Sequence, residues 1–299
     1  MVRIKKKILG NKEYYYLEHT FRLGKQIEKK EVYVGKTIPE NIEKIKNKFL
    51  HDIYKEKWYP VLERIKGRFV KAMKHTPPSA KLKDLEAFMI RFTYNTQKIE
   101  GSALTLGETA NLLEDKITPK NKPVADIKET EAHKKVFYNM LKYKKDLSLQ
   151  IVLQWHRELF LESKPDIAGK IRRHQVAIAR SKFILPFPAE LDALLKEFFG
   201  WYAQNKNKIH IIELAALVHL KFVTIHPFYD GNGRISRLIM NFVLQKHDYP
   251  MLDIPYTKRA SYYNALERAQ IKKIDHIFVQ WFIKQYIKEH DSVKLINDD

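Results

Sequence analysis

The 299-residue chain contains no cysteine, which excludes disulfide bonds, thiol catalysis and cysteine-ligated metal centres. No apolar run approaches the length of a membrane span. The charged start of the chain is not followed by the apolar stretch of a signal peptide. A Walker A pattern and a complete dinucleotide-binding glycine pattern are also missing. These absences predict a cytoplasmic protein that does not span a membrane.

Acidic residues are scarce relative to basic ones: the chain has 55 Lys and Arg residues but 35 Asp and Glu residues, so its net charge is +20. More than half of this excess lies in residues 1–75. Such a surface either docks nucleic acid or an acidic protein, or is a solvated surface rich in Lys and Glu. Glu residues are interleaved throughout and no nucleic-acid-binding signature is present, which favours the solvated surface without excluding nucleic acid.

Residues 226–237, HPFYDGNGRISR, combine a base, a carboxylate, glycines and two arginines in one short stretch. Gly231 and Gly233 permit a tight turn whose exposed N–H groups bind anions. The residues that follow have apolar side chains at helical spacing, so these N–H groups are expected at a helix N-terminus, where the dipole also favours anions. Arg234 and Arg237 then lie on one face of the helix, as a forked clamp for phosphates.

Two other residues of the stretch suggest metal and proton chemistry. Asp230 offers a hard oxygen ligand for a Mg²⁺ ion that bridges phosphates. His226, with an ordinary pKa of about 6.5, suits a general base near neutral pH. Taken singly, a DGNG turn or a histidine before proline is common in proteins of any function. A calcium loop is excluded, because its fifth and twelfth positions are Arg234 and Asn241.

The whole string resembles the signature of the Fic family, His-x-Phe-x-Asp/Glu-Gly-Asn-Gly-Arg-x-x-Arg, with every defining position filled. The resemblance implies a protein adenylyltransferase, which transfers AMP from ATP to a Tyr, Thr or Ser hydroxyl of a target protein. It implies that His226 takes the proton from the attacking hydroxyl and that Asp230 binds Mg²⁺. It also implies that the remaining motif residues hold the phosphates: Gly231, Asn232, Gly233, Arg234 and, at the γ-phosphate, Arg237.

A second motif, TQKIEG at residues 96–101, follows an amphipathic stretch that predicts a helix. Thr96 and Glu100 share one helix face, and Gly101 suits the position just past the helix end. From the residues alone, Glu100 reads as an exposed surface glutamate. However, the motif resembles the inhibitory helix (about 82–100) of autoinhibited Fic proteins, which implies that Glu100 pairs with Arg237 and blocks the γ-phosphate. In some relatives this glutamate instead orients a water that removes AMP, so a de-AMPylase stays open.

Residues 169–188 form the clearest β-like stretch between the predicted helices. They resemble the family's flap, a hairpin that covers the nucleotide and aligns a target segment by strand addition. The flap positions that the resemblance places against ATP are Val176, Ala177, Ile178 and Ala179. The stretch from residue 259 resembles the end of the Fic core and adds three candidate nucleotide contacts: Tyr262, Tyr263 and Gln270. His156 is interpreted as structural.

Apolar periodicity predicts a mainly α fold, with a Fic-type helical bundle, a β-hairpin flap and a small N-terminal β-meander. Helices are expected at about 40–74, 80–99, 106–114, 125–143, 148–161, 189–204, 209–223, 232–246, 259–271 and 275–290. Thr76-Pro-Pro-Ser79 predicts a boundary. The expected divisions are a basic N-terminal region (1–78), a Fic-type core (79–290) and a polar tail (291–299).

A non-catalytic role is the alternative from another class, namely a basic adaptor that binds ATP. His226 argues against it, because ATP binding alone does not require a base. UMP or phosphate transfer stays open as well, since one fold supports several reactions. The resemblance also leaves a homodimer open, although no interface follows from the sequence.

Overall fold

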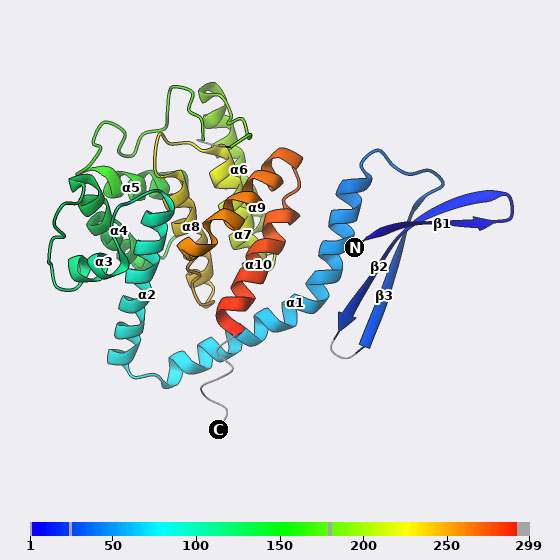
Figure 1. Cartoon of the computed structure of the whole chain (residues 1–299), viewed down its shortest axis with the longest axis horizontal. Coiled ribbons are helices and arrows are strands. Elements are labelled where there is room, and N and C mark those ends of the chain that lie inside the picture. The colour runs from blue at the N-terminus through cyan, green and yellow to red at the C-terminus, as the bar shows by residue number, and fades with distance from the viewer. Residues whose placement is uncertain (1, 24–25, 179–180, 292–299) are drawn as a thin grey trace.

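A computed structural model describes residues 2–23, 26–178 and 181–291 of the chain. Within these ranges the chain forms ten α-helices, two short 3-10 helices and one antiparallel sheet (Figure 1). The mainly α prediction is therefore confirmed. None of the described helices combines the length and apolar character needed to cross a membrane. The predicted polar tail, from residue 292 onwards, lies outside the described residues.

The helices closely match the periodic segments of the sequence. Their bounds are α1 (Ile42–His75), α2 (Pro78–Ile99), α3 (Leu106–Leu113), α4 (Val124–Lys142), α5 (Leu149–Phe160), α6 (Leu191–Asn205), α7 (Ile211–Ile225), α8 (Asn232–Lys246), α9 (Arg259–Lys272) and α10 (His276–Asp291). The short helices are η1 (Pro188–Glu190) and η2 (Tyr256–Lys258). Each predicted helix agrees with an observed one to within two residues at either end.

The N-terminal meander is also present, as β1 (Arg3–Leu9), β2 (Lys12–Leu23) and β3 (Gln26–Gly35) in sequential order. Leu17 lies opposite Ile4 on one side and Val32 on the other, and it is fully buried. A sheet this small needs a hydrophobic face or packing against a helix to be stable, and this one packs on α1. The ring of His19 meets Tyr54 of α1 edge-on, with centroids 6.4 Å apart.

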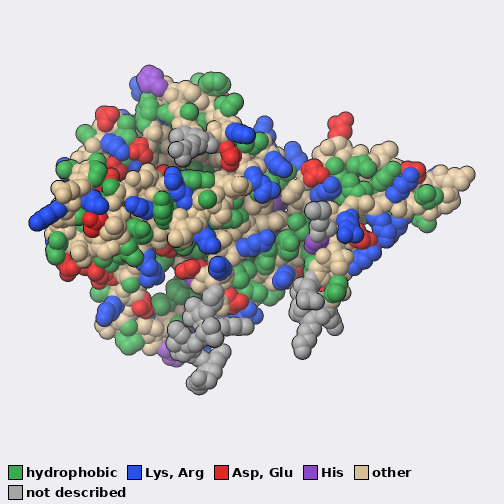
Figure 2. All heavy atoms as spheres, viewed as in Figure 1, with side chains coloured by type: hydrophobic (Ala, Val, Ile, Leu, Met, Phe, Trp, Pro, Cys, Tyr) green, Lys and Arg blue, Asp and Glu red, His purple; other side chains and the backbone are tan. Residues whose placement is uncertain are grey.

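Basic side chains of the sheet are paired with glutamates across strands. Lys7 lies 2.6 Å from Glu31, and Lys29 lies 2.6 Å from Glu18. Figure 2 shows Lys and Arg spread over the visible face of the molecule, with Asp and Glu among them. On this face the two signs of charge are interspersed, as in a solvated surface rich in Lys and Glu.

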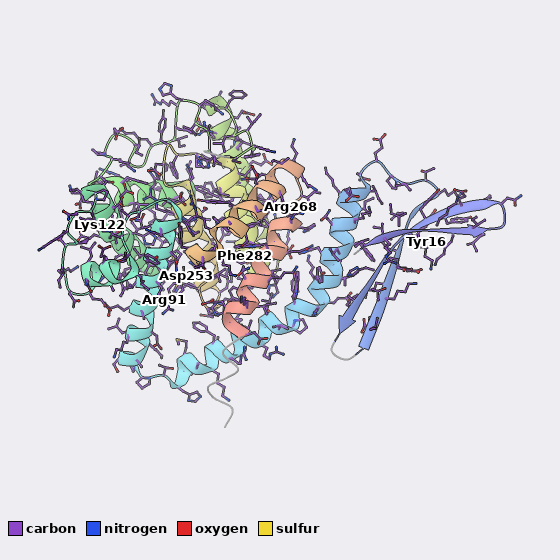
Figure 3. The ribbon with its side chains drawn as sticks, in the orientation of Figure 1. Tyr16, Arg91, Lys122, Asp253, Arg268 and Phe282 are labelled. Atoms are coloured by element: carbon purple, nitrogen blue, oxygen red, sulfur yellow. The ribbon has the colours of Figure 1, made fainter. Side chains whose placement is uncertain are left out.

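The core is centred on α7, which is mostly apolar and almost wholly buried, as expected for a helix surrounded by others. Helix α8 packs along it, and α10 contributes the fully buried Phe282, labelled in Figure 3. Trp58, Leu62 and Ile65 of α1 belong to the same core and face α10. Helix α1 bends along its length, and Pro60 within it removes one helical hydrogen bond.

The predicted boundary near residue 78 coincides with the break between α1 and α2, where Thr76 and Pro77 separate the two helices. The proposed division of the chain at that point stays a prediction, because α1 shares its core with the later helices.

Candidate active site

The loop between α7 and α8 carries the first part of the sequence motif. Helix α7 ends at His226, whose left-handed backbone (φ 52°) turns the chain sharply. Gly231, at φ 79°, then starts α8. Asn232 braces the loop, because its side chain accepts from the Phe228 N–H at 2.9 Å and donates to the Phe228 carbonyl at 2.8 Å. The side chain of Asn232 thus holds the loop in shape, and its contact with a phosphate stays a prediction.

His226 is held in a form that can accept a proton. Its Nδ1 lies 3.2 Å from the Val223 carbonyl, so Nδ1–H donates there and Nε2 keeps its lone pair. Burial lowers the pKa of His226 to about 4, which keeps the ring neutral at pH 7. The buried Arg172 fixes the backbone, donating from Nε to the His226 carbonyl at 2.8 Å. Sequence reasoning missed Arg172, for which no pattern gave a signal.

Arg237 of α8 is held by the C-terminal end of α2. Its Nε donates to Oγ1 of Thr96 at 2.6 Å, and Nη2 donates to the Thr96 carbonyl at 3.1 Å. Nη2 also pairs with Oε1 of Glu100 at 2.6 Å. The predicted pairing of Glu100 with Arg237 is therefore present. Gly101, at φ 105°, ends the helix in the backbone region that favours glycine.

The Glu100 carboxylate lies directly over the first turn of α8. A Cβ added to Gly233 would collide with Oε1 of Glu100 and would lie 3.2 Å from Nη1 of Arg237. The absence of a side chain at Gly233 is what permits this approach. Because a helix N-terminus attracts anions, Glu100 occupies a place that also suits a phosphate group.

Asp230 and Arg234 belong to a second ionic cluster, on another side of the loop. Nη2 of Arg234 lies 2.9 Å from Asp230, and Nη1 lies 3.0 Å from Oε1 of Gln97 and also pairs with Glu129. Lys164 lies 2.5 Å from Asp230 and 3.1 Å from Glu129. Burial raises the pKa of Asp230, but Arg234 and Lys164 outweigh this and lower it to about 2.

Sequence reasoning missed Glu129 and Lys164. A signal for Glu129 does exist, because it shares a face of α4 with the buried Val136, Phe137 and Met140. A carboxylate on an apolar helix face requires a buried cation. Lys164 gives no such signal, since it is one of many lysines and lies in a loop after α5.

A cavity of about 770 Å³ opens beside α8, a size typical of small-ligand sites. It brings together these predicted site residues: Glu100, Ile178, His226, Gly233, Arg237, Tyr262, Tyr263 and Gln270. The lining of the cavity does not include these others: Val176, Ala177, Asp230, Gly231, Asn232 and Arg234. Ala179 lies outside the described residues.

Two tyrosines and one glutamine of α9 line this cavity, and their hydrogen bonds differ. Tyr262 is buried, and its hydroxyl lies 3.2 Å from Nη1 of Arg237 and 2.9 Å from Nε2 of His219. Tyr263 donates to the Ile99 carbonyl at 3.3 Å, and Gln270 donates to Thr224 at 3.1 Å. Tyr262 therefore positions Arg237, in addition to lining the cavity.

The predicted flap strands are not formed in the described part of the segment, which has no strand in residues 170–178 and 181–187. Its two arms are linked by side chains instead. Gln175 donates to the Leu185 carbonyl at 3.0 Å, and Arg172 donates to the Pro186 carbonyl at 2.6 Å. These side chains use carbonyls that a ladder would need, and Pro186 has no N–H to donate. Glu267 of α9 holds the second arm through the Lys182 N–H at 2.6 Å.

Comparison with known proteins agrees with the motif. Residues 146–244 match the model of the Fic/DOC family. Protein adenylyltransferase Fic of Drosophila melanogaster is 34% identical over 180 residues, which cover 59% of this chain and 36% of the relative. The corresponding protein of Drosophila mojavensis is 35% identical over 180 residues, with the same coverage. The chain thus matches little more than a third of the length of these curated relatives.

Solved structures show the same fold. A Fic-domain-containing signalling protein from Bacteroides thetaiotaomicron is 27% identical, with a TM-score of 0.70 over 77% of this chain and 94% of that one. A segment of Fic-1 from C. elegans is 26% identical, with a TM-score of 0.71 over 81% of this chain and 72% of that one. These comparisons agree with the resemblance that the motif indicated: residues 146–244 match the Fic/DOC family model, and the fold is similar to that of solved Fic-domain proteins.

Proposed function

We propose that the chain is a protein adenylyltransferase that transfers AMP from ATP to a hydroxyl of a target protein and is autoinhibited by Glu100. The observation that carries the proposal is the meeting of His226, Arg237 and Glu100 on one cavity at the start of α8. The names of the curated relatives support the reaction.

The residues have complementary roles in this reaction. The hydroxyl oxygen attacks the α-phosphorus while Nε2 of His226 takes its proton, and the bond from phosphorus to the bridging oxygen breaks to release pyrophosphate. Arg237 binds the γ-phosphate, and the first turn of α8 favours the negative charge of the phosphates. Positioning and charge stabilisation supply most of the rate enhancement in such a displacement.

Asp230 fits a magnesium ligand, because it is ionised and offers hard oxygen atoms. When bound, Mg²⁺ would neutralise phosphate charge. Lys164 has to leave Asp230 before the ion is held there, since the two side chains are 2.5 Å apart.

Glu100 acts as the brake because Arg237 cannot pair fully with the carboxylate and with a γ-phosphate at once. The guanidinium is also bonded to Thr96 at Nε and to Tyr262 at Nη1. Removal of the carboxylate therefore frees the group that ATP needs.

The test is transfer of α-phosphate-labelled AMP from ATP and Mg²⁺, scored as self-labelling of the protein. Wild type is expected to label weakly, Glu100→Gly strongly, and Glu100→Gly with His226→Ala not at all. Glu114→Gly is the control, because Glu114 is an exposed residue at the end of α3. If none of the proteins became labelled although each bound ATP, self-adenylylation would be ruled out.

Removal of AMP is the second candidate function. It is favoured by the location of Glu100, whose carboxylate lines the same cavity as His226 and can orient a water there. Protein labelled by Glu100→Gly, cleared of ATP, is mixed with unlabelled wild type. Loss of label with wild type, but not with added Glu100→Gly, supports hydrolysis, whereas stable label excludes it.

A further inference from the structure

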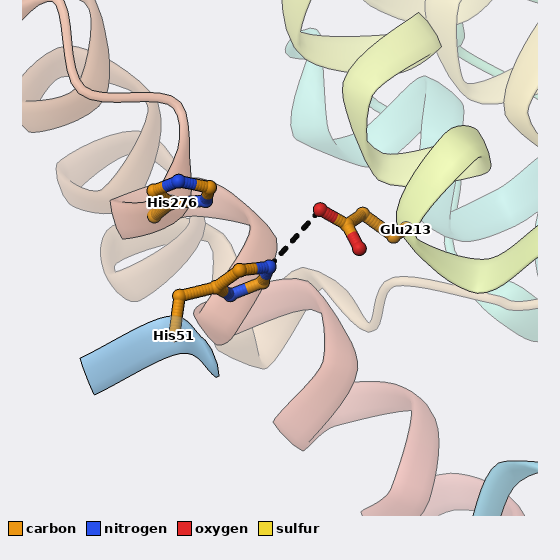
Figure 4. A group of neighbouring side chains, drawn as sticks. All are labelled: His51, Glu213 and His276. Atoms are coloured by element: carbon orange, nitrogen blue, oxygen red, sulfur yellow. Dashed lines mark hydrogen bonds and ion pairs between the residues drawn. The ribbon is translucent and has the colours of Figure 1, made fainter. Parts of the chain in front are cut away.

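A group of potential metal ligands lies at the N-terminal end of α7, whereas the motif loop follows the C-terminal end of that helix. His51 of α1, Glu213 of α7 and His276 of α10 converge there from three helices that are distant in sequence (Figure 4). One ligand atom from each residue lies within 4.8 Å of the other two. His51 and Glu213 are buried, and His276 is partly buried.

The spacing approaches that of a tetrahedral metal site. Nε2 of His51 lies 3.0 Å from Oε1 of Glu213. Bonds of about 2.0 Å at tetrahedral angles place neighbouring ligand atoms roughly 3.3 Å apart, so this pair needs little adjustment. His276, the first residue of α10, stacks on His51 with centroids 4.1 Å apart, so its ring has to turn out of this stack to direct a nitrogen at a shared ion.

A ring nitrogen of the group has no hydrogen-bond partner in the described part of the chain, and a bound cation could take the place of that partner. Nδ1 of His276 is buried and has no hydrogen-bond partner among the described residues. It is one of twelve buried side-chain atoms without a partner among the described residues, and a bound ion is one way in which such an atom is satisfied. Coordination of the His276 ring would give this side chain a partner.

The surroundings of Glu213 orient its carboxylate in the way that supporting residues orient a metal ligand. Oε2 accepts from the Tyr59 hydroxyl and lies 3.2 Å from Nζ of Lys55. Oε1 is thereby directed toward His51. The Lys55 side chain is 34% exposed, so it can turn to solvent when a cation enters.

We propose that His51, Glu213 and His276 bind a divalent transition metal of the Zn²⁺ type. Two imidazoles and one carboxylate suit Zn²⁺ better than Mg²⁺, which prefers oxygen ligands. The three ligands leave a fourth tetrahedral position for water. The ion fastens α1, and through it the N-terminal sheet, to α7 and α10. Since the site is separate from the catalytic cavity, it does not depend on the proposed reaction.

The experiment is a Zn²⁺ titration of full-length protein that has been dialysed against a chelator, in the presence of excess Mg²⁺. Bound metal is measured by mass spectrometry after gel filtration. Wild type is expected to retain about one equivalent and to melt at a higher temperature with Zn²⁺ than without it. His51→Gln and His276→Gln are expected to lose both effects. His247→Gln is the matched control, a partly buried histidine outside the cluster, and Asp230→Asn tests that the proposed magnesium ligand is not involved.

Wild-type protein loaded with Co²⁺ provides a readout that needs no variant to fold. The visible absorption of a tetrahedral Co²⁺ site with nitrogen and oxygen ligands supports the proposal. Failure of wild type to retain Zn²⁺, or retention of Zn²⁺ by both histidine variants, overturns it.

Discussion

Nη2 of Arg237 lies 2.6 Å from Oε1 of Glu100, and this contact fastens α8 to the end of α2. The guanidinium is 1% exposed, and each of its three nitrogens has a partner on Thr96, Glu100 or Tyr262. A buried cation requires this degree of pairing. Any anion that reaches Arg237 from the cavity therefore competes with contacts that are already formed.

Replacement of Glu100 by glycine is expected to destabilise the ligand-free protein and to increase its response to ATP. Arg237 loses its carboxylate, so the free energy of unfolding falls by about 2 kcal/mol. ATP with Mg²⁺ then supplies the missing negative charge and raises the melting temperature by more than in wild type. Glu100→Gln, which retains the shape but not the charge, is expected to be intermediate. Equal ATP shifts in all three proteins would contradict the competition for Arg237.

The rate of AMP transfer is expected to stay level as the pH falls from 8 to about 5 and to drop only below that. Burial lowers the pKa of His226 to about 4, so the ring stays neutral, and able to take a proton, until the pH approaches that value. An unburied histidine would lose activity around its ordinary pKa of 6.5. The profile is measured on Glu100→Gly, with circular dichroism at each pH to show that the protein stays folded. A midpoint near 6.5 would show that the burial effect is absent.

Tyr262→Phe is expected to destabilise the protein more than Tyr263→Phe. The Tyr262 hydroxyl accepts from Arg237 and shares a hydrogen bond with His219, and both partners are buried. Its removal leaves two buried groups without a partner, at a cost of about 2 kcal/mol. Tyr263 makes one 3.3 Å bond at the cavity edge, so its replacement costs roughly 0.5 kcal/mol. Chemical denaturation of both variants gives the comparison, and similar losses would argue against a positioning role for Tyr262.

Asp253→Asn is expected to stabilise the protein at pH 7.5. Asp253, labelled in Figure 3, is buried after α8, with Oδ2 2.6 Å from Nδ2 of Asn95 and Oδ1 without a hydrogen-bond partner among the described residues. Burial raises its pKa from 3.8 to about 6. The carboxyl thus favours folding below pH 3.8, and this contribution is lost as the pH rises through 6.

The side-chain amide that this substitution introduces would keep the contact with Asn95 without a buried charge. The expected gain is on the order of 2 kcal/mol at pH 7.5 and shrinks toward zero near the ordinary pKa of 3.8. Denaturation across this range is the measurement, with Asp248→Asn, a residue in the turn after α8, as control. A gain that does not change with pH would exclude titration of Asp253 as its cause.

The helices could be predicted from the sequence because apolar residues recur at helical spacing and because helix breaks are marked, as by Thr76 and Pro77 between α1 and α2. The pairing of Glu100 with Arg237 could be anticipated only from a family motif, because nothing local links residues 137 positions apart. The partners of Asp230 show the limit of such reasoning. Lys164 reaches it through tertiary folding, and no short-range pattern distinguishes that lysine from its many exposed counterparts.

The strands predicted for the flap are not formed in its described residues, for a physical reason of the same kind. Alternating Val, Ala and Ile residues predict strands, but propensity does not fix where carbonyl groups find donors. Here Arg172 and Gln175 supply those donors from their side chains. The contacts that the buried Arg172 makes with distant carbonyls arise from the packed structure and cannot be predicted from the local sequence.

Helix α1 joins the N-terminal sheet to α2, with Thr76 and Pro77 between the two helices (Figure 1). The middle of α1 is fixed by packing in the core beside α10, through Trp58, Leu62 and Ile65. The N-terminal part of α1 leads from the sheet, and its C-terminal part leads to α2, which ends beside Glu100. A displacement of the sheet would therefore have to disturb the packing of α1 on α10 before it affects α2.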